Sequence, residues 1–280
     1  MSKKFIAYLD ILGFKDLVEK NPHEELCFLY ENFVTQLYNA IALVEPVVIN
    51  GREEIVFDHP KITLNSLMIS DGIIIWTDDN TIESFIKIAL AVRGILHILF
   101  KRGLPLRGAI VEGDIKKIDK GLLNPTDNSP TTLVGLGLVK AYETEAKQDW
   151  SGCIVDESCI KTYKEYHSQN HHISGFADFE KSVNQLFIEY EIPMKSGELK
   201  KEYAINWVSF SGTCQINGAM IRPMFQQHNK DCKKWDVERK IKNTIDFVEH
   251  VRKNQSSYTD PMHQVYPELE WHSRCDRSVF

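Results

Sequence analysis

Apolar and polar positions alternate at the start of the chain and predict a strand over residues 5–11, with Asp10 near its end. Apolar residues then recur at helical spacing over residues 22–44. Asn21 and Pro22 precede this stretch and are typical of a helix start. The pattern predicts an amphipathic helix that packs on a sheet.

Further segments of the same kinds complete a core in the order strand, helix, strand, strand, helix, strand. They are two strands, a helix and a last strand, at residues 62–69, 73–76, 81–102 and 104–111. Asn80 or Thr81 is expected to cap the helix, and Gly103 to end it. The two strands are so close that a hairpin is expected, with Asp71 at its turn. This order is that of a ferredoxin-like α+β sheet with its helices on one face.

Beyond this core the pattern predicts additions rather than a second domain. In chain order they are a loop, a helix, a short strand, a polar stretch, two strands and a late helix, over residues 115–131, 133–147, 153–156, 163–178, 185–192, 202–210 and 237–251. Residues 253–280 show no clear period and are expected to form a tail or a partner-contacting arm. With no repeat or linker, we predict one elaborated domain over residues 1–280, with a core of about 5–156 and an extension of about 157–252.

Composition narrows the class of protein. Of 280 residues, 43% are hydrophobic, which is ample for a sizeable core, and the formal net charge is -6. Charge of both signs is spread along the chain, so neither nucleic acid nor an anionic membrane is expected as a partner. The longest apolar stretch, residues 85–100, is interrupted by Lys87, Arg93 and His97, so no transmembrane helix is expected.

The N-terminus and the cysteines indicate the compartment. The first residues run directly into a strand without the form of a signal peptide, which predicts a cytoplasmic protein. The six cysteines include no Cys-x-x-Cys pair, so neither a zinc site nor a disulfide framework is indicated. We therefore expect reduced, mostly structural thiols.

Two aspartates in apolar surroundings are the most informative residues. Asp10 ends the first predicted strand and Asp71 occupies the hairpin turn, and such charges are rarely desolvated without a partner. Because the predicted sheet sets that strand beside the hairpin, the two carboxylates are expected to share cations. Hard oxygen ligands favour Mg²⁺ or Mn²⁺ bound jointly with substrate phosphates, with the Ile11 carbonyl as a further ligand. The turn over residues 12–15 offers N–H groups to phosphate oxygens, although Gly13 also fits an ordinary strand-ending glycine.

These motifs resemble those of the class III nucleotidyl cyclases, whose catalytic domains begin with Asp-Ile-x-Gly-Phe and carry a second metal-binding aspartate in a hairpin. The similar segments are residues 10–14, 70–71, 106–113 and 135–145. The resemblance covers about residues 5–156. It implies the cyclase form of the fold, two divalent cations held by Asp10, Ile11 and Asp71, and nucleotide binding by Gly13 and Phe14.

Departures from the family pattern point to a subgroup. Leu67 stands where purine cyclases carry a base-reading Lys or Glu, the second such position falls near Thr132, and the family's transition-state Asn and Arg fall on Val139 and Glu143. In this the chain looks most like the bacterial pyrimidine cyclases of the Pycsar antiphage system. The resemblance implies conversion of UTP to cyclic UMP, or of CTP to cyclic CMP, with UTP the commoner substrate in that group. Leu67, Thr131 and Thr132 would then line a pocket for a compact base.

Two cationic residues are candidates to meet the substrate triphosphate. Arg107 is the first candidate to stabilise charge developing on the phosphorus, and Lys140 is the second. The ordinary alternatives are a surface strand arginine and a solvated helix lysine. Cations at the aspartates would lower the pKa of the substrate 3′-hydroxyl, so no protein general base is needed.

The resemblance further implies a homodimer with two shared active sites, and a separate effector protein that responds to the cyclic nucleotide. Two other functions stay open. A catalytically silent module that binds nucleotide or a partner protein fits the missing Asn and Arg equivalents. A purine cyclase with an altered pocket is opposed by Leu67, which makes no base-discriminating hydrogen bond.

Overall fold

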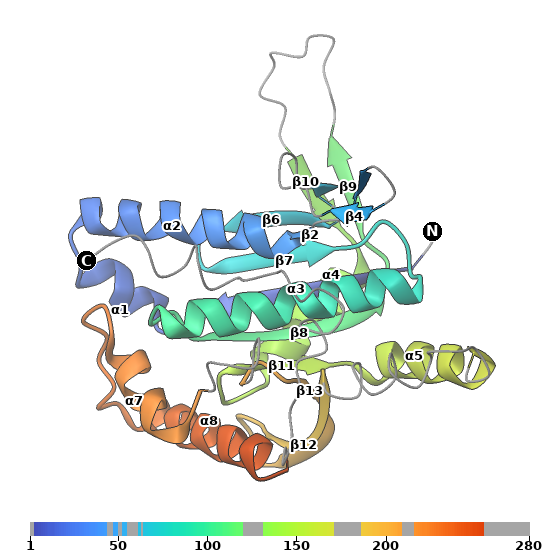
Figure 1. Cartoon of the computed structure of the whole chain (residues 1–280). Helices are drawn as coiled ribbons and strands as arrows, with labels where there is room; N and C mark the ends of the chain where they lie inside the picture. The colour runs from blue at the N-terminus through green and yellow to red at the C-terminus, as the bar shows by residue number, and fades with distance from the viewer. Residues whose placement is uncertain are drawn as a thin grey trace.

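A seven-stranded, mostly antiparallel sheet organises the protein (Figure 1). The computed structural model describes residues 3–43, 47–49, 52–54, 61–62, 64–119, 131–170, 186–208 and 216–254. The strands, in their order across the sheet, are β12 (Phe187–Pro193), β13 (Leu199–Ile205), β11 (Gly152–Val155), β8 (Leu106–Gly113), β1 (Lys4–Ile11), β7 (Gly72–Trp76) and β6 (Asn65–Ile69). Within this sheet the β8–β11 pair is parallel.

Helices and three short strand pairs complete the described part of the chain. The helices are α1 (Phe14–Glu19), α2 (His23–Ile41), α3 (Ile82–Lys101), α4 (Leu136–Ala146), α5 (Glu157–Asn170), α7 (Gly218–Gln226) and α8 (Trp235–Asn254). The short pairs are β2 (Ala42–Leu43) with β5 (Lys61–Ile62), β3 (Val47–Ile49) with β4 (Arg52–Glu54), and β9 (Lys116–Asp119) with β10 (Thr131–Val134). The protein is thus α+β, as the sequence predicts at this level of detail.

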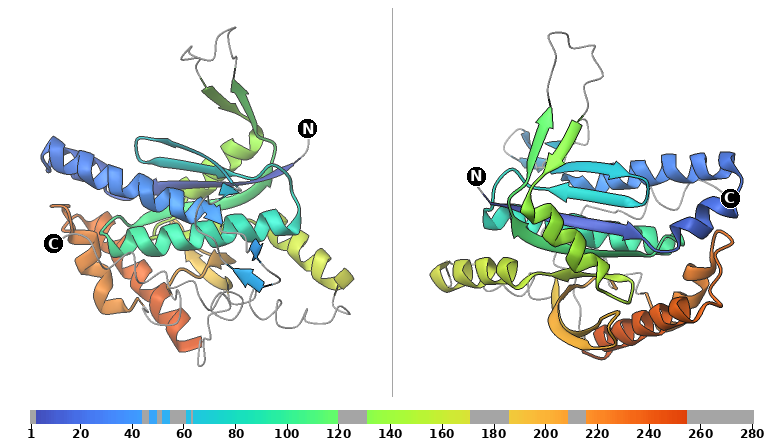
Figure 2. Two further views of the ribbon diagram at one scale, coloured as in Figure 1. Left: turned by 45° about the horizontal axis from the view of Figure 1, so that its top comes forward. Right: turned by 180° about the vertical axis from the view of Figure 1, so that it is seen from behind.

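The two faces of the sheet are covered unequally. Alternate residues of β1, beginning with Phe5 and Ala7, belong to the large core that includes α2 and α3. On the other face, Ile6 and Tyr8 belong to a small cluster that α4 joins through Ala141. Seen from behind, α4 crosses this second face beside β1 (Figure 2). We call this face, on which Asp10 also lies, the open face.

The first strand lies beside the hairpin, as the sequence predicts. β1 pairs antiparallel with β7 on one side and with β8 on the other. In this register Asp10 is opposite Gly72 on β7 and Arg107 on β8. The hairpin turn is tight because Ser70 adopts a left-handed backbone with φ 58°. The turn therefore carries Asp71 to the end of β1.

Several predicted boundaries are wrong for identifiable reasons. The loop expected over residues 115–131 contains β9 and the start of β10, and this pairing delays the next helix to Leu136. The polar stretch expected from residue 163 belongs to α5 as far as Asn170, because its few apolar residues recur at helical spacing and are buried. The hydrophobic pattern did not predict α7, which contains Pro223. The tail expected over residues 253–280 lies outside the described residues except for the end of α8.

The C-terminal extension is part of the same sheet and core. β13 pairs with β11, setting Ala204 opposite Ile154, and β12 pairs with β13 in turn. From α8, Phe247 packs edge-on against Trp150 with ring centroids 4.6 Å apart. Across the described residues, no helix is both long enough and apolar enough to cross a membrane.

Candidate active site

Asp10 and Asp71 meet at one end of the open face. The Ile11 N–H donates to the Asp71 carbonyl at 3.2 Å, which fastens the hairpin turn to the end of β1. Asp10 lies opposite Gly72, the residue that follows Asp71, so the two aspartates converge at this end of the sheet. Burial, followed by the charges of Glu145 and Asp71, raises the pKa of Asp10 to about 7, although Arg107 acts in the opposite direction. The two aspartates predicted from the sequence therefore lie together, and the charge of Asp71 contributes to the raised pKa of Asp10.

Arg107 is buried beside this pair rather than exposed on a surface strand. Its Nε donates to Glu145, its Nη1 donates to the Gln148 carbonyl at 3.0 Å, and its Nη2 lies 3.7 Å from an Asp10 oxygen. The Arg107 side chain is only 8% exposed. These contacts fix the guanidinium between two carboxylates, so it offsets their charge and orients them.

Glu145 is a buried acid that motif matching alone did not mark as part of the site. It lies in the last turn of α4 and is 2% exposed. Burial raises the pKa of Glu145 more than the neighbouring Arg107 lowers it. Because Asp71 also contributes to this shift, three carboxylates are electrostatically coupled around one arginine. The segment that resembles the family's helix motif, residues 135–145, ends at Glu145, and this position in the motif is the signal that could have identified it.

The donor set suits a hard divalent cation. The charge of Asp71 is one of the causes that raise the pKa of Asp10, and a cation bound between the two carboxylates would offset this repulsion. Mg²⁺ typically takes one or two protein carboxylates and completes its shell with water and substrate phosphates. Glu145 is held by Arg107 instead, and the described residues contain no group of three or more His, Cys, Asp or Glu arranged for a metal. Asp10 and Asp71 are thus the protein carboxylates available for a cation.

The turn after β1 is shaped by Gly13, which precedes α1 with φ 78°. This left-handed conformation explains the glycine without any ligand. Phe14 turns inward, with its ring centroid 6.4 Å from that of Tyr30. Since α1 has only six residues, its dipole adds little to anion binding. The phosphate contacts predicted for this turn therefore rest on Gly13 and its neighbouring N–H groups.

Two tyrosines near the carboxylates were not predicted from the sequence. Tyr8 lies two residues before Asp10 on the same face, and its hydroxyl is 3.0 Å from the position that a Cβ on Gly72 would occupy. Burial and the charge of Asp10 raise the pKa of Tyr8 to about 12. Tyr142 of α4 packs edge-on against it, with centroids 5.5 Å apart. Strand alternation alone could have identified Tyr8.

Tyr30 approaches the site from α2. Burial and the charge of Asp71 raise the pKa of its phenol to about 12. Its buried hydroxyl has no hydrogen-bond partner among the described residues. The Tyr30 hydroxyl could therefore donate a hydrogen bond to a group bound near Asp71. No motif in the sequence around Tyr30 predicts this position.

The remaining predicted residues divide between near and far positions. Leu67 lies opposite Ile74 on the open face, in the same small cluster as Tyr8. The Lys140 Nζ donates to the Asp156 carboxylate at 2.7 Å, just beyond the end of β11. Its ammonium group is therefore not directed at Asp10 or Asp71. Thr132 is exposed on β10. The side chain of Thr131 lies outside the described residues.

Val139 and Glu143 are exposed on α4. Neither occupies the carboxylate site, and neither supplies a cation or an amide to it. The groups that the family would place at these two positions thus have no equivalent on α4 of this chain.

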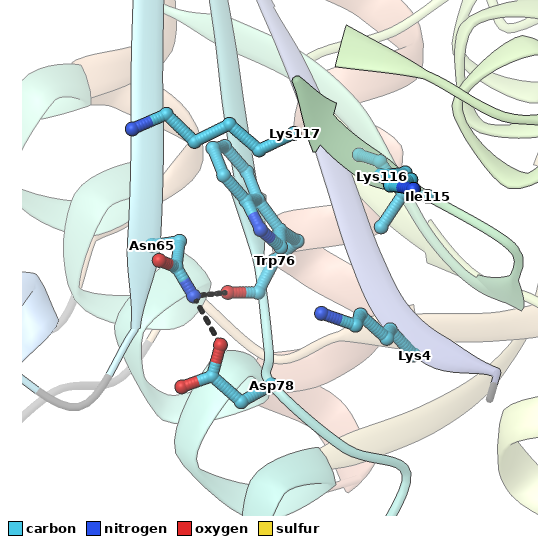
Figure 3. Close-up of a pocket in the computed structure, with 7 residues that line it drawn as sticks. All are labelled: Lys4, Asn65, Trp76, Asp78, Ile115, Lys116 and Lys117. Atoms are coloured by element: carbon cyan, nitrogen blue, oxygen red, sulfur yellow. Dashed lines mark hydrogen bonds between the residues drawn. The ribbon is translucent and has the colours of Figure 1, made fainter. Parts of the chain in front are cut away.

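A pocket of about 400 Å³ opens at the other end of the open face (Figure 3). It is lined by Lys4, Asn65, Trp76, Asp78, Ile115, Lys116 and Lys117. The Asn65 amide donates to Asp78 at 2.9 Å and to the Trp76 carbonyl at 3.5 Å. Lys4 precedes Asp10 by six positions on β1, which corresponds to roughly 20 Å. The pocket and the carboxylates are thus separate features of one face.

The chain matches no protein-family model, and no curated protein sequence matches it significantly.

Proposed function

We propose that the protein is a class III nucleotidyl cyclase that converts a pyrimidine nucleoside triphosphate, in the first place UTP, into the 3′,5′-cyclic monophosphate and pyrophosphate. The observation that carries this proposal is the convergence of Asp10 and Asp71 at the end of β1, close enough for the charge of Asp71 to act on Asp10. The order β8-β1-β7-β6, with α2 and α3 on one face, is also that of a ferredoxin-like unit. By its resemblance to the Pycsar cyclases, the product would act in antiphage defence through a separate effector protein.

Asp10 and Asp71, with the Ile11 carbonyl, would hold Mg²⁺ or Mn²⁺ in this reaction. Such ions make the 3′-hydroxyl more acidic and offset negative charge on the phosphates. The 3′-oxygen bonds to the α-phosphorus while the bond to pyrophosphate breaks, and the hydroxyl proton leaves to solvent. Arg107 keeps Asp10 oriented and lowers the cost of its charge, so the arginine acts as a positioning residue rather than a phosphate ligand.

A pyrimidine is favoured by the side chains next to the carboxylates. Tyr8 and Tyr142 fill the open face beside Asp10, and Leu67 adds an apolar surface. The Leu67 side chain makes no hydrogen bond that discriminates a purine, and the two tyrosine rings restrict the room for a base. CTP is the alternative substrate, because the described side chains near Asp10 do not separate the two pyrimidines.

The proposed homodimer would bring the two features of the open face together. Large apolar side chains that are exposed around this face favour a second copy as its cover. They are Ile69, Leu136, Val139 and Tyr142. If two open faces pair head to tail, the lysine-lined pocket of one subunit faces the carboxylates and triphosphate of the other. The opposite charges of these two sets of groups favour that arrangement.

The catalytically silent module is the second candidate function. It is favoured by Val139 and Glu143 at the positions of the family's asparagine and arginine, and by the engagement of Arg107 with Glu145. A silent module would bind a nucleotide without forming a cyclic product.

Incubation with each of the four labelled nucleoside triphosphates and Mn²⁺ tests the proposal. We expect cyclic UMP from the wild type, and a loss of at least about a hundredfold in Asp71→Asn because a metal carboxylate is removed. Asp246→Asn, exposed on α8, is the matched control and should retain full activity. Nucleotide binding without any cyclic product would favour the silent module, and unchanged turnover in Asp71→Asn would refute the metal assignment.

Mixing two inactive variants tests the shared site. Asp71→Asn and the double variant Lys4→Glu/Lys117→Glu should each be inactive alone, while the mixture regains activity because one heterodimer site keeps both wild-type halves. No recovery after subunit exchange, demonstrated by a mass-labelled heterodimer, would refute the proposed arrangement of the dimer.

A further inference from the structure

The loop between α7 and α8, residues 227–234, is fastened to the segment that follows Asp10. The Asp231 N–H donates to the Asp16 carboxylate at 2.8 Å, across 215 positions of sequence. The Asn21 amide donates to the His228 carbonyl at 2.8 Å. All views of the ribbon place this loop next to α1 (Figures 1 and 2). The C-terminal extension thus reaches the immediate surroundings of the carboxylate site.

Lys230 is the residue of this loop that bridges two parts of the core. Its Cδ lies 3.0 Å from the position that a Cβ on Gly13 would occupy, so its aliphatic stem packs directly on the turn after β1. Its Nζ donates to the Gly103 carbonyl at 2.5 Å, at the end of α3. The residue is 8% exposed. A buried lysine with this contact links the turn to the corner between α3 and β8.

The same corner holds the turn by a second route. The Leu12 N–H donates to the Pro105 carbonyl at 2.9 Å, and the His228 ring lies 2.8 Å from the Arg102 carbonyl. Residues 102–105 are therefore a common anchor for the turn and for the α7–α8 loop. Movement of the loop would be transmitted to the turn through Lys230.

The loop itself is held in an unfavourable conformation. His228 and Asn229 have φ values of 57° and 58°, in the left-handed region that side chains with a Cβ disfavour. Such conformations persist where surrounding contacts determine them, and they cluster at functional elements. The backbone here is thus set by its attachments rather than by local preference.

We propose that Lys230 is a positioning residue for the carboxylate site, because it fixes the turn that directs the chain immediately after Asp10 and Ile11. This role rests on the proposed function, because the reaction that Lys230 would support is the proposed cyclisation. It assigns the C-terminal extension a part in catalysis that extends beyond completing the sheet. Lys230 touches neither aspartate, so it acts through the turn.

Lys230→Met tests this role, since methionine keeps the apolar stem over Gly13 and removes the ammonium group. We expect kcat to fall at least about tenfold, with KM for the nucleotide within about twofold, because a small misplacement of reacting groups is costly. The Mn²⁺ affinity, measured without nucleotide by electron paramagnetic resonance, should also fall. Lys233→Met, an exposed lysine of the same loop, is the matched control and should change none of these values.

Hydrogen exchange supplies a readout that needs no substrate. In Lys230→Met the backbone amides of residues 11–17 should exchange at least about tenfold faster, while those of the sheet stay protected. Unchanged exchange and unchanged Mn²⁺ affinity would overturn the proposal, as would faster exchange throughout the molecule, which indicates a general structural role. A wild type that forms no cyclic nucleotide would instead refute the proposed function. The exchange result would still test whether Lys230 fixes the turn.

Discussion

At the scale of single residues, the carboxylate site is unfavourable without a cation. Asp10 is half-buried near Asp71 and Glu145, and Arg107 is the cation that contacts it among the described residues. The single positive charge of Arg107 does not offset the negative ones, so Asp10, with a pKa of about 7, is partly protonated at neutral pH in the folded protein, whereas in the unfolded chain it is ionised. This excess negative charge is what a divalent cation would neutralise.

Asp10→Asn should stabilise the metal-free protein in a pH-dependent manner. The pKa of Asp10 is about 7 in the folded state, against an ordinary aspartate value of 3.8, so its charge destabilises the fold increasingly as pH rises between these values. At pH 8 we expect a gain on the order of 2 kcal/mol in the free energy of unfolding, since one pKa unit corresponds to about 1.4 kcal/mol and the side chain is partly solvated.

Urea denaturation with EDTA between pH 4 and pH 8 measures this effect. The gain should vanish near pH 4, where Asp10 is protonated in the folded protein. Asp246→Asn should show no such trend, and a gain that did not depend on pH would contradict the electrostatic explanation.

Glu145→Ala should weaken the fold, because it removes the acceptor of the Arg107 Nε–H and leaves a cavity at a residue that is 2% exposed. The loss of one partner from a buried ion pair leaves the other charge less well compensated, and relief of Asp10 offsets only part of this. We expect the free energy of unfolding at pH 7 to fall by about 1 to 3 kcal/mol. Glu143→Ala, exposed on the same helix, is the control, and equal effects of the two variants would argue against a buried pair.

At the scale of elements, the sequence predicted best where the hydrophobic pattern is strong and local. Asp10 and Asp71 could be brought together from the pattern because β1 alternates cleanly and the hairpin turn is short. The connections of Lys230 to Gly13 and of Arg107 to Glu145 could not be predicted, since they depend on long-range packing. The hydrophobic pattern thus predicts the two aspartates but not the residues that fix their positions.

Gly13→Ala should destabilise the turn by two separable effects. The left-handed backbone at φ 78° disfavours any Cβ, and the added methyl would also press on the Lys230 stem. Gly197→Ala is the matched control, because Gly197 has φ 89° with nothing within 4 Å of the added atom. We expect a loss of about 1 kcal/mol for Gly197→Ala and a larger loss for Gly13→Ala in chemical denaturation. Equal losses would mean that the Lys230 contact adds no constraint.

At the scale of the whole molecule, the extension is inseparable from the core. β11 has β13 as its outer neighbour, and Trp150, fully buried beside β11, contacts both Tyr190 and Phe247. Removing the extension would expose this indole and a strand edge at the same time. The core of about residues 5–156 is therefore incomplete as a folding unit.

A chain ended after Asp156 should consequently lack a cooperative thermal unfolding transition. The expected reason is the exposure of Trp150 and of the β11 edge, which β13 covers in the full chain. Near-ultraviolet circular dichroism and calorimetry of the purified fragment provide the measurement. A sharp transition with native aromatic signals in the fragment would show that the first half folds alone.

The contact between the α7–α8 loop and the turn after Asp10 also determines when, during synthesis, the surroundings of the carboxylate site are complete. The partners Asp16 and Asp231 are 215 positions apart, so at about 5 to 20 residues per second a ribosome needs ~10 to 40 s between them. During that interval the turn after Asp10 lacks its contact with Lys230. On the proposed function, a nascent chain would thus not reach full activity until residue 230 has been synthesised and the loop has packed on the turn.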